Sequence, residues 1–278
     1  MIARGWSWAK SSLLGLVRDP EHQVILTPDK IGVGNFLYIW MQVMIKRDRG
    51  LSASATRTPP MDEWLEQFPA VRELLVERSE ISFRASRLHG YYQAIPHDYS
   101  ADDVSSFCRR FLLGGSPFER LVGRNPSEPG VVVINVRRGD YYSNPTHRGN
   151  YSFDVVEYVR AAVAQSRESA PITEFVVVSD DIAWCRVKLA WLVGEAPVTW
   201  FDEPGGPPAH LARLAGASRL ILANSTFSYW GGYLAQARDP SAKVVAPWFH
   251  ARHMGGGRLF HALPSWSLVE SIPGGWDG

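Results

Sequence analysis

From Val131 onward, short β-branched runs alternate with amphipathic stretches, and this alternation constrains the fold more than any other feature. The runs are VVVINV, EFVVVSD, PVTWF, RLILAN and KVVAP, and the segments between them include SFDVVEYVRAAVAQS, HLARLAGA and FSYWGGYLAQA. A strand and helix series of this kind predicts an α/β fold with a parallel sheet and helices on both faces. The continuous apolar runs indicate strands that are buried on both sides.

The first 125 residues predict a second, less regular α/β half. This part contains the run QVILT, the apolar segment FLYIWMQVMIK and the helix-like stretch DEWLEQFPAVRELLVE. The stretch LLGGSPFERLVGRNPSEPG is rich in Gly, Pro and polar residues and is the predicted linker. We therefore place a domain boundary near Pro126, with an N-terminal domain over 1–125 and a C-terminal domain over 126–278.

Charge, cysteine content and hydropathy exclude several classes of protein. The net charge of +1 does not suggest a nucleic-acid binder, so any anion site must be built locally. Cys108 and Cys185 are too few for a disulfide framework and predict core thiols in a reducing compartment. The longest apolar stretch, 36–45, is about half of what a bilayer crossing needs, and residues 1–23 do not read as a signal peptide. We expect a cytoplasmic protein without integral membrane association, either free or peripheral at the inner membrane face.

Ligands of open α/β sheets bind beyond the carboxyl ends of the strands, so the residues after each run are the candidates. Arg137, Arg138, Gly139 and Asp140 follow VVVINV. Adjacent guanidiniums there are costly unless an anion meets them, and strand alternation sends the two side chains to opposite faces. Two interpretations stand about even: a phosphate site, or an ion pair in which Asp140 neutralises one arginine.

Two further strand ends carry polar residues. The segment 224–227 follows RLILA and opens a helix, where hydroxyls and backbone N–H groups indicate a phosphate site, with a plain N-cap as the alternative. Asp180 and Asp181 follow EFVVVS, where a carboxylate can accept from a guanine edge or from ribose, or can cap a helix. The two acids are adjacent, with no other carboxylate or histidine nearby in the sequence, so no metal is expected.

The N-terminal half offers weaker signals. Gly32, Gly34 and Asn35 lie between a predicted strand and an amphipathic segment, where glycines let a ligand approach the backbone. The segment 90–93 brings two tyrosines and an amide to the end of another predicted strand.

Taken in order, these segments resemble the α-1,2-fucosyltransferases, inverting glycosyltransferase family 11. The family pattern HxRRGDY is similar to 135–141, SDDIxWC to 179–185 and ANSTFSxWG to 223–231. An SNP element, a GYxQ element and an APxxW-like element match Ser143 to Pro145, Gly90 to Gln93 and Ala246 to Trp248. The chain departs from the family at Asn135, where the family has His, and at Phe36, where it has Gln.

The resemblance implies a GT-B-like architecture of two facing Rossmann-like domains, with the acceptor on the N-terminal side and GDP-fucose bound by the C-terminal domain. A galactose hydroxyl of a glycan acceptor would attack the anomeric carbon of GDP-β-L-fucose and give an α-1,2 linkage. GDP-fucose is the co-substrate, and the resemblance implies neither a metal nor another cofactor. The alternatives are a related transferase with a different donor or acceptor, and a glycan- or nucleotide-binding protein without turnover.

The resemblance also assigns residues. Arg137 would hold the diphosphate, Asp140 is the nearest carboxylate that could remove the acceptor proton, and Asn35 completes the catalytic set. The donor-binding set is Gly32, Gly34, Asn35, Asn135, Arg137, Arg138, Asp180, Asp181, Asn224, Ser225, Thr226 and Phe227. The acceptor-binding set is Tyr91, Tyr92 and Gln93.

Overall fold

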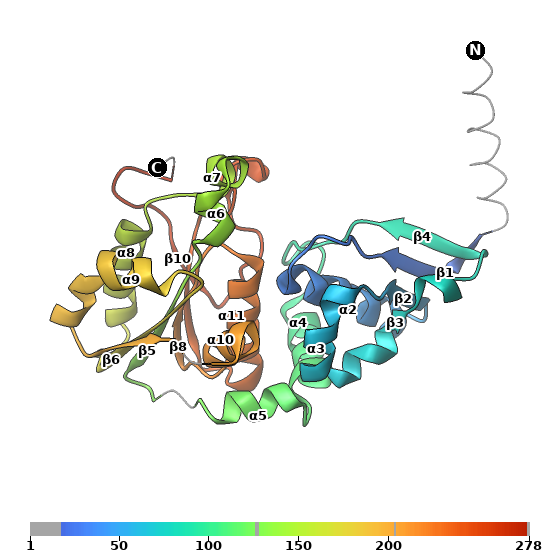
Figure 1. Ribbon diagram of the computed structural model, residues 1–278, viewed down its shortest axis with the longest axis horizontal. Coiled ribbons are helices and arrows are strands. Elements are labelled where there is room, and N and C mark those ends of the chain that lie inside the picture. The colour runs from blue at the N-terminus through green and yellow to red at the C-terminus, as the bar shows by residue number, and fades with distance from the viewer. Residues whose placement is uncertain (1–17, 126–127, 203, 277–278) are drawn as a thin grey trace, which may run out of the picture. The chain divides into compact units, whose positions relative to one another are not determined.

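The computed structural model describes residues 18–125, 128–202 and 204–276 (Figure 1). The chain forms two compact units, Met1–Tyr92 and Gln93–Gly278. Each contains a parallel β-sheet with flanking helices, which confirms the predicted α/β class. Pro126 and the N-terminal segment 1–17 lie outside the described residues.

The smaller unit has a four-stranded parallel sheet with strand order β3-β2-β1-β4. Its main helix, α2, is Val33–Asp48, and residues 36–45 of this helix are all buried. A helix with apolar residues around its whole circumference is buried on all sides, which explains the continuous apolar sequence of α2. The elements are β1 (Asp19–Leu26), α2, β2 (Ser52–Thr56), η1 (Pro59–Met61), α3 (Asp62–Gln67), η2 (Pro69–Leu74), β3 (Leu75–Val76), η3 (Arg78–Glu80) and β4 (Ala85–His89).

The larger unit has a six-stranded parallel sheet with strand order β10-β9-β8-β5-β6-β7. Counted along the chain from β5, this is the 3-2-1-4-5-6 order of a doubly wound Rossmann fold. The strands are β5 (Val131–Val136), β6 (Glu174–Ser179), β7 (Val198–Phe201), β8 (Arg219–Ile221), β9 (Lys243–Pro247) and β10 (Ser267–Val269). The helices are α4 (Ala101–Phe107), η4 (Cys108–Leu113), α5 (Pro117–Gly123), α6 (Gly139–Ser143), α7 (Pro145–Tyr151), α8 (Val155–Arg167), α9 (Ile182–Lys188), η5 (Ala190–Gly194), α10 (Gly206–Ala215), α11 (Thr226–Arg238) and η6 (Gly255–Gly257).

Helices cover both faces of this sheet, with α8 and α9 on one side and α10 and α11 on the other (Figure 1). All six residues of β5 are buried, as the run VVVINV predicts for a central strand. Val132, Ile134 and Val136 join one apolar cluster with residues of α8 and α9. Strand alternation therefore turns the odd-numbered residues of β5 toward the opposite face.

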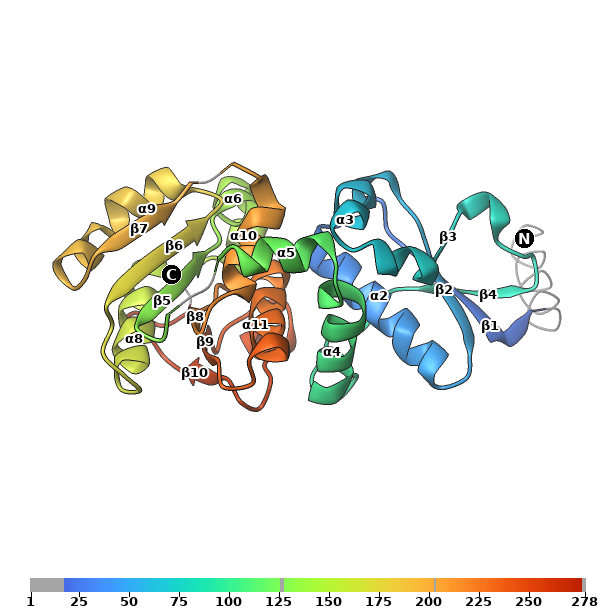
Figure 2. The same ribbon diagram turned by 90° about the horizontal axis from the view of Figure 1, so that it is seen from below.

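The structure divides the chain earlier than the predicted boundary, because residues 93–125 pack with the larger unit. Phe107 meets Trp230 of α11 edge-on, with ring centroids 5.6 Å apart. The predicted linker is wrong in its central part, where α5 forms and packs against α10 (Figure 2). The helix signal is local: the Ser116 hydroxyl accepts from Glu119 N, and Pro117 occupies the first helical position.

Both cysteines are buried free thiols, as predicted, and burial raises the pKa of Cys185 to about 11. Several of the large aromatic side chains, among them Trp40, Trp230 and Tyr229, are fully buried in the two cores. Across the described residues, the structure contains no helix with the length and apolar character to cross a bilayer.

Candidate active site

The candidate site lies at the carboxyl ends of β5 and β8, where the strand order of the larger sheet reverses. These strands are hydrogen-bonded neighbours, although the chain forms two other strands between them. Loops from β5 and β8 therefore leave the sheet side by side and open a crevice between them. Arg137 comes directly after β5, and Asn224 and Ser225 come shortly after β8.

Arg137 is held by two carboxylates. Its Nη1 donates to Asp180 Oδ2 at 2.6 Å, and its Nη2 donates to Asp140 Oδ1. The side chain keeps 35% of its surface exposed. A guanidinium carries five N–H donors, so these two bonds leave donors for an anion. The ion pair expected for Asp140 is therefore present, and it is compatible with a phosphate site.

Asp180 also fixes the turn that follows β5. Its Oδ1 accepts from the backbone N–H of Arg138 at 2.8 Å, while its Oδ2 holds Arg137. A Cβ atom at Gly139 would lie 2.5 Å from Asp180 Oδ2. A larger residue would have to displace this carboxylate, which explains the glycine of the RRGD segment.

Arg138 points to different partners from Arg137. Its guanidinium lies over the Tyr142 ring at 3.9 Å and over the Trp184 ring at 4.1 Å, and its side chain is 18% exposed. Asp181 caps α9 by accepting from Trp184 N, and its Oδ2 lies 3.8 Å from Arg138 Nε. A cavity of about 360 Å³ adjoins this stack, lined by Arg138, Gly139, Tyr142, Ser143, Asp180 and Asp181.

The start of α11 supplies backbone donors beside β5. Ser225 caps the helix by accepting from Ser228 N at 3.2 Å, and Thr226 and Phe227 are its first two residues. Their N–H groups have no acceptor within the helix, and the dipole of a 13-residue helix favours an anion there. Asn224 has a structural contact, since its Nδ2 donates to Tyr151 O and His250 O.

Asn135 is buried within β5, and its Nδ2 donates to Val178 O of β6 at 3.1 Å. Phe36 is in the core of the smaller unit, where it stacks on Trp40 with ring centroids 6.0 Å apart. The two departures from the family pattern are thus accommodated by hydrogen bonding and packing.

Sequence reasoning missed His147, Tyr141 and Tyr151. His147 Nδ1 lies 2.9 Å from Asp140 Oδ2, and the Tyr141 and Tyr151 rings stack at 4.4 Å. The available signal was Asn144-Pro145, a cap followed by proline, which starts α7 and places His147 and Tyr151 four residues apart on one helix face. Burial raises the pKa of both tyrosines.

A second group of rings, which includes Tyr229 of α11, lies in the core of the larger unit. Tyr229 OH and His250 Nδ1 are 2.8 Å apart, and the Tyr229 ring stacks on His261. Burial lowers the pKa of His250 to about 4 and holds the pKa of His261 well below its ordinary value, so both side chains are neutral. Gln93, expected to bind the acceptor, has its Oε1 3.0 Å from His261 Nε2.

In the smaller unit the strand order reverses between β1 and β4, and the N-terminal candidates follow these two strands along the chain. Gly34 and Asn35, expected between the strand and the amphipathic segment, belong to the helix itself, because Gly32 is the N-cap of α2 and the helix begins at Val33. Gly32 has an extended backbone, and its carbonyl accepts from the N–H groups of Asn35 and Phe36, as is usual at the start of a helix. After β4, Gly90 has φ +91°, which favours glycine, and the Tyr92 side chain is 59% exposed.

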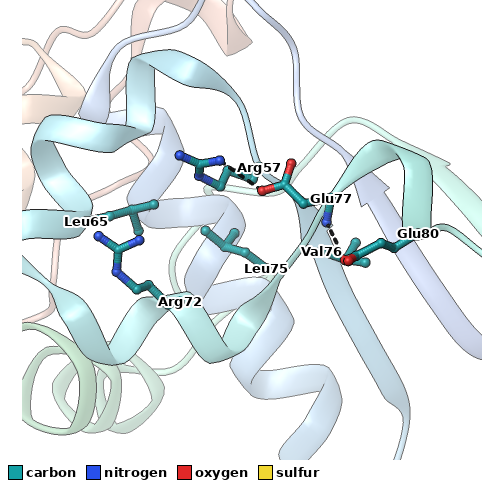
Figure 3. A pocket seen from close by; sticks show the side chains of 7 residues that line it. All are labelled: Arg57, Leu65, Arg72, Leu75, Val76, Glu77 and Glu80. Carbon is teal, nitrogen blue, oxygen red and sulfur yellow. Dashed lines mark hydrogen bonds and ion pairs between the residues drawn. The ribbon is translucent and has the colours of Figure 1, made fainter.

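A cavity of about 350 Å³ in the smaller unit lies beside the ends of β2 and β3 (Figure 3). Arg57 points at Glu77 there and also pairs with Asp62. The lining residues are Arg57, Leu65, Arg72, Leu75, Val76, Glu77 and Glu80. In the part of the chain that the structure describes, no group of three or more His, Cys, Asp or Glu side chains is placed to hold a metal ion.

The sequence of this chain is similar to those of several known proteins. The chain is 30% identical over 141 residues to galactoside alpha-(1,2)-fucosyltransferase 1 of Saimiri sciureus and of Leontocebus fuscicollis. Each match spans 50% of this chain and 36% of the relative, so the chain matches about a third of the length of these proteins.

Among solved structures, the chain is similar to POFUT1 in complex with GDP-fucose, with a TM-score of 0.40 and 13% identity over 84% of this chain and 76% of that chain. POFUT1 in complex with GDP gives a TM-score of 0.39 and 14% identity over 84% and 77%. The sequence model of glycosyl transferase family 11 matches residues 52–252, a span that contains Arg137, Asp180 and the start of α11. This chain belongs to glycosyl transferase family 11.

Proposed function

We propose that this protein transfers L-fucose from GDP-β-L-fucose to a galactose hydroxyl of a glycan, forming an α-1,2 linkage. The observation that carries the proposal is Arg137, which lies at the strand-order reversal of the larger sheet beside the N-terminus of α11. Family membership and the names of the galactoside alpha-(1,2)-fucosyltransferase relatives support it.

The donor diphosphate is proposed to lie between Arg137 and the N–H groups of Thr226 and Phe227, aided by the Ser225 hydroxyl. Negative charge grows on the diphosphate as the glycosidic bond breaks, and fixed donors aimed at that charge lower the barrier. Asp180 holds Arg137 and the turn in place. These residues would therefore contribute mainly to kcat.

The guanosine end is proposed to reach the cavity beside Arg138 and Asp181. One Asp181 oxygen caps α9, and the other can accept from a guanine edge or ribose hydroxyl. Asn135 and Asn224 would act on the donor indirectly, since their side-chain amides bond backbone carbonyls.

The smaller unit is proposed to serve the acceptor. Gly32, Gly34 and Asn35 open α2, and Tyr91 and Tyr92 follow β4 at the reversal of that sheet. Exposed aromatic faces suit the apolar face of a sugar ring. Gln93 is proposed to join the acceptor side, and Gly32, Gly34 and Asn35 are proposed to contact the donor sugar and phosphate.

The transfer is proposed to need no metal, because Arg137 and the α11 N-terminus supply the positive charge. The test is GDP release from GDP-fucose with a galactoside acceptor, in chelator and with Mn²⁺ added, beside a panel of other nucleotide sugars. We expect transfer with GDP-fucose in both conditions. Activity that disappears in chelator and returns with Mn²⁺ would contradict the metal-free mechanism, and transfer from another donor alone would contradict the donor assignment.

A further inference from the structure

The acceptor proton needs a base, and most groups at the candidate site are already engaged. Asp140 uses Oδ1 for Arg137 and Oδ2 for His147. Asp180 uses both oxygens, for Arg137 and for the backbone of Arg138. A carboxylate whose oxygens hold donors is a poor acceptor for a further proton.

The neighbouring phenols are poor bases too. Burial raises the pKa of Tyr141, and burial together with the negative charge of Asp140 raises the pKa of Tyr151. Both phenols therefore stay protonated near neutral pH. His250 is buried and bonded through Nδ1 to Tyr229, which removes it from solvent and from a substrate.

His147 has the geometry that these groups lack. Its Nδ1 lies 2.9 Å from Asp140 Oδ2, and an ionised carboxylate there makes Nδ1 the protonated nitrogen. The neutral ring then presents Nε2 as the acceptor, and among the described residues no hydrogen bond to Nε2 is formed. The side chain is 43% exposed, so a substrate can reach it.

The helix that carries His147 is fixed at both ends. Asn144 caps α7 through Thr146 N, and Tyr151 O accepts from Asn224 Nδ2 after β8. The Tyr151 ring also meets the His147 ring edge-on, with centroids 6.0 Å apart. Asp140 therefore links a positioned imidazole directly to Arg137, the residue placed against the leaving diphosphate.

We propose that His147 is the general base of the transfer and that Asp140 is its positioning residue. This inference rests on the proposed function. The acceptor oxygen forms its bond to the anomeric carbon and gives its proton to Nε2. The bond from the anomeric carbon to the phosphate oxygen breaks, its electron pair leaves with GDP, and the imidazolium passes the proton to solvent. The arrangement follows the logic of an aspartate that orients a catalytic histidine.

The test compares His147→Gln with His253→Gln. His253 also meets Tyr151 edge-on, at 5.6 Å, so its replacement controls for loss of a ring contact. We expect His147→Gln to lower kcat for fucosyl transfer by about 10²- to 10⁴-fold, with GDP affinity and thermal unfolding unchanged. His253→Gln should keep its turnover.

A pH profile separates a base from a structural residue. The groups facing His147 are Asp140 from α6 and Tyr151 from α7, and His253 also meets the Tyr151 ring edge-on. In the unmodified protein, kcat should rise with pH on the acidic side of the profile (its acidic limb), because only a neutral imidazole accepts a proton. His147→Gln should flatten this rise.

The outcomes distinguish the two proposals. If the unmodified protein binds GDP but transfers fucose to none of the galactosides, the proposed function fails. If it transfers fucose and His147→Gln keeps near-normal kcat, or retains the acidic limb, the base assignment fails and the function stands. A loss in His253→Gln alone would also overturn the assignment.

Discussion

Two arginines, one in each unit, have closely similar local surroundings. Arg57 directly follows β2 of the smaller sheet and pairs with Asp62 at 2.6 Å and Glu77 at 2.9 Å. Arg137 directly follows β5 of the larger sheet and pairs with Asp140 and Asp180. Their side chains are 36% and 35% exposed. Pairing with two carboxylates at a strand end is therefore not in itself the sign of a ligand site.

The position of each arginine in its sheet is what differs. Arg57 follows β2, beside the edge strand β3, while the strand order of its sheet reverses between β1 and β4. Its partner Glu77 also caps η3 together with Glu80. Arg137 lies at the reversal itself, beside the start of α11, and its partner Asp140 also contacts His147. Topology thus separates a structural ion pair from a candidate catalytic group.

The largest expected effect comes from Arg137→Ala compared with Arg57→Ala. Removing one preorganised donor from a growing negative charge costs about 10²- to 10³-fold in turnover, so Arg137→Ala should show that loss. Arg137→Lys should recover it only in part, because a point charge does not reproduce a bidentate fork. Arg57→Ala should keep its kcat. Steady-state kinetics of the three variants measure the contrast.

Arg138→Ala serves as a control in the same assay. It removes a guanidinium that contacts the Tyr142 and Trp184 rings. The thermal unfolding temperature should therefore fall, while turnover changes little. If Arg138→Ala were folded but inactive while Arg137→Ala stayed active, the phosphate-binding role would belong to Arg138 and the structural role to Arg137.

The next effect concerns the turn after β5. Gly139→Ala places a methyl group 2.5 Å from Asp180 Oδ2 and must displace the carboxylate that holds Arg137. We expect GDP affinity to fall by about tenfold, equivalent to about 1.4 kcal/mol, in calorimetric titration. Gly123→Ala, at the end of α5, is the matched change away from the site, because nothing described lies within 4 Å of the added Cβ, and it should bind GDP normally. Equal losses in both variants would contradict the comparison.

A smaller effect is expected at Asp181. Asp181→Ser keeps a side-chain oxygen to cap α9 but removes the carboxylate that is proposed to meet guanine. The preference for GDP over ADP should narrow while the thermal unfolding temperature stays nearly constant. Titration of both nucleotides checks this, and an unchanged preference would leave Asp181 with its capping role alone.

The smallest effect is expected at Tyr92. Its exposed ring makes Tyr92→Ala harmless to folding, and loss of one aromatic contact to a sugar should raise the acceptor KM by about two- to tenfold. The KM for GDP-fucose should not change. A rise in the donor KM with no change in the acceptor KM would move this residue to the donor side.

The sequence predicted five of the six strands of the larger sheet, because strands such as Val131–Val136 and Glu174–Ser179 are rich in valine and other apolar residues, and it missed the short β10. It predicted the smaller unit less well. β3 has only two residues, Leu75–Val76, and follows a 3₁₀ segment, so no periodicity marks it. The composition of the predicted linker gave a wrong prediction at 117–123, because the glycines and prolines around this segment suggested a loop. The segment is a helix with an ordinary serine cap.

The candidate site shows the same limit. Arg137, Asp180 and Ser225 could be found because each follows a recognisable buried strand. The bond between Asp140 and His147 could not, because it joins two short helices that carry little periodic signal. Asn135 and Phe36 looked like changes in a ligand site, and only their buried contacts show how the fold accommodates them.

The central claim is that the nucleotide binds at the carboxyl edge of the larger sheet. Amide hydrogen exchange with and without saturating GDP tests this claim residue by residue. We predict slower exchange in the turn after β5 (137–140), at the start of α9 (180–184) and at the start of α11 (225–228), with segment 57–80 of the smaller unit unchanged. Slower exchange in 57–80, with those three segments unchanged, would contradict the account.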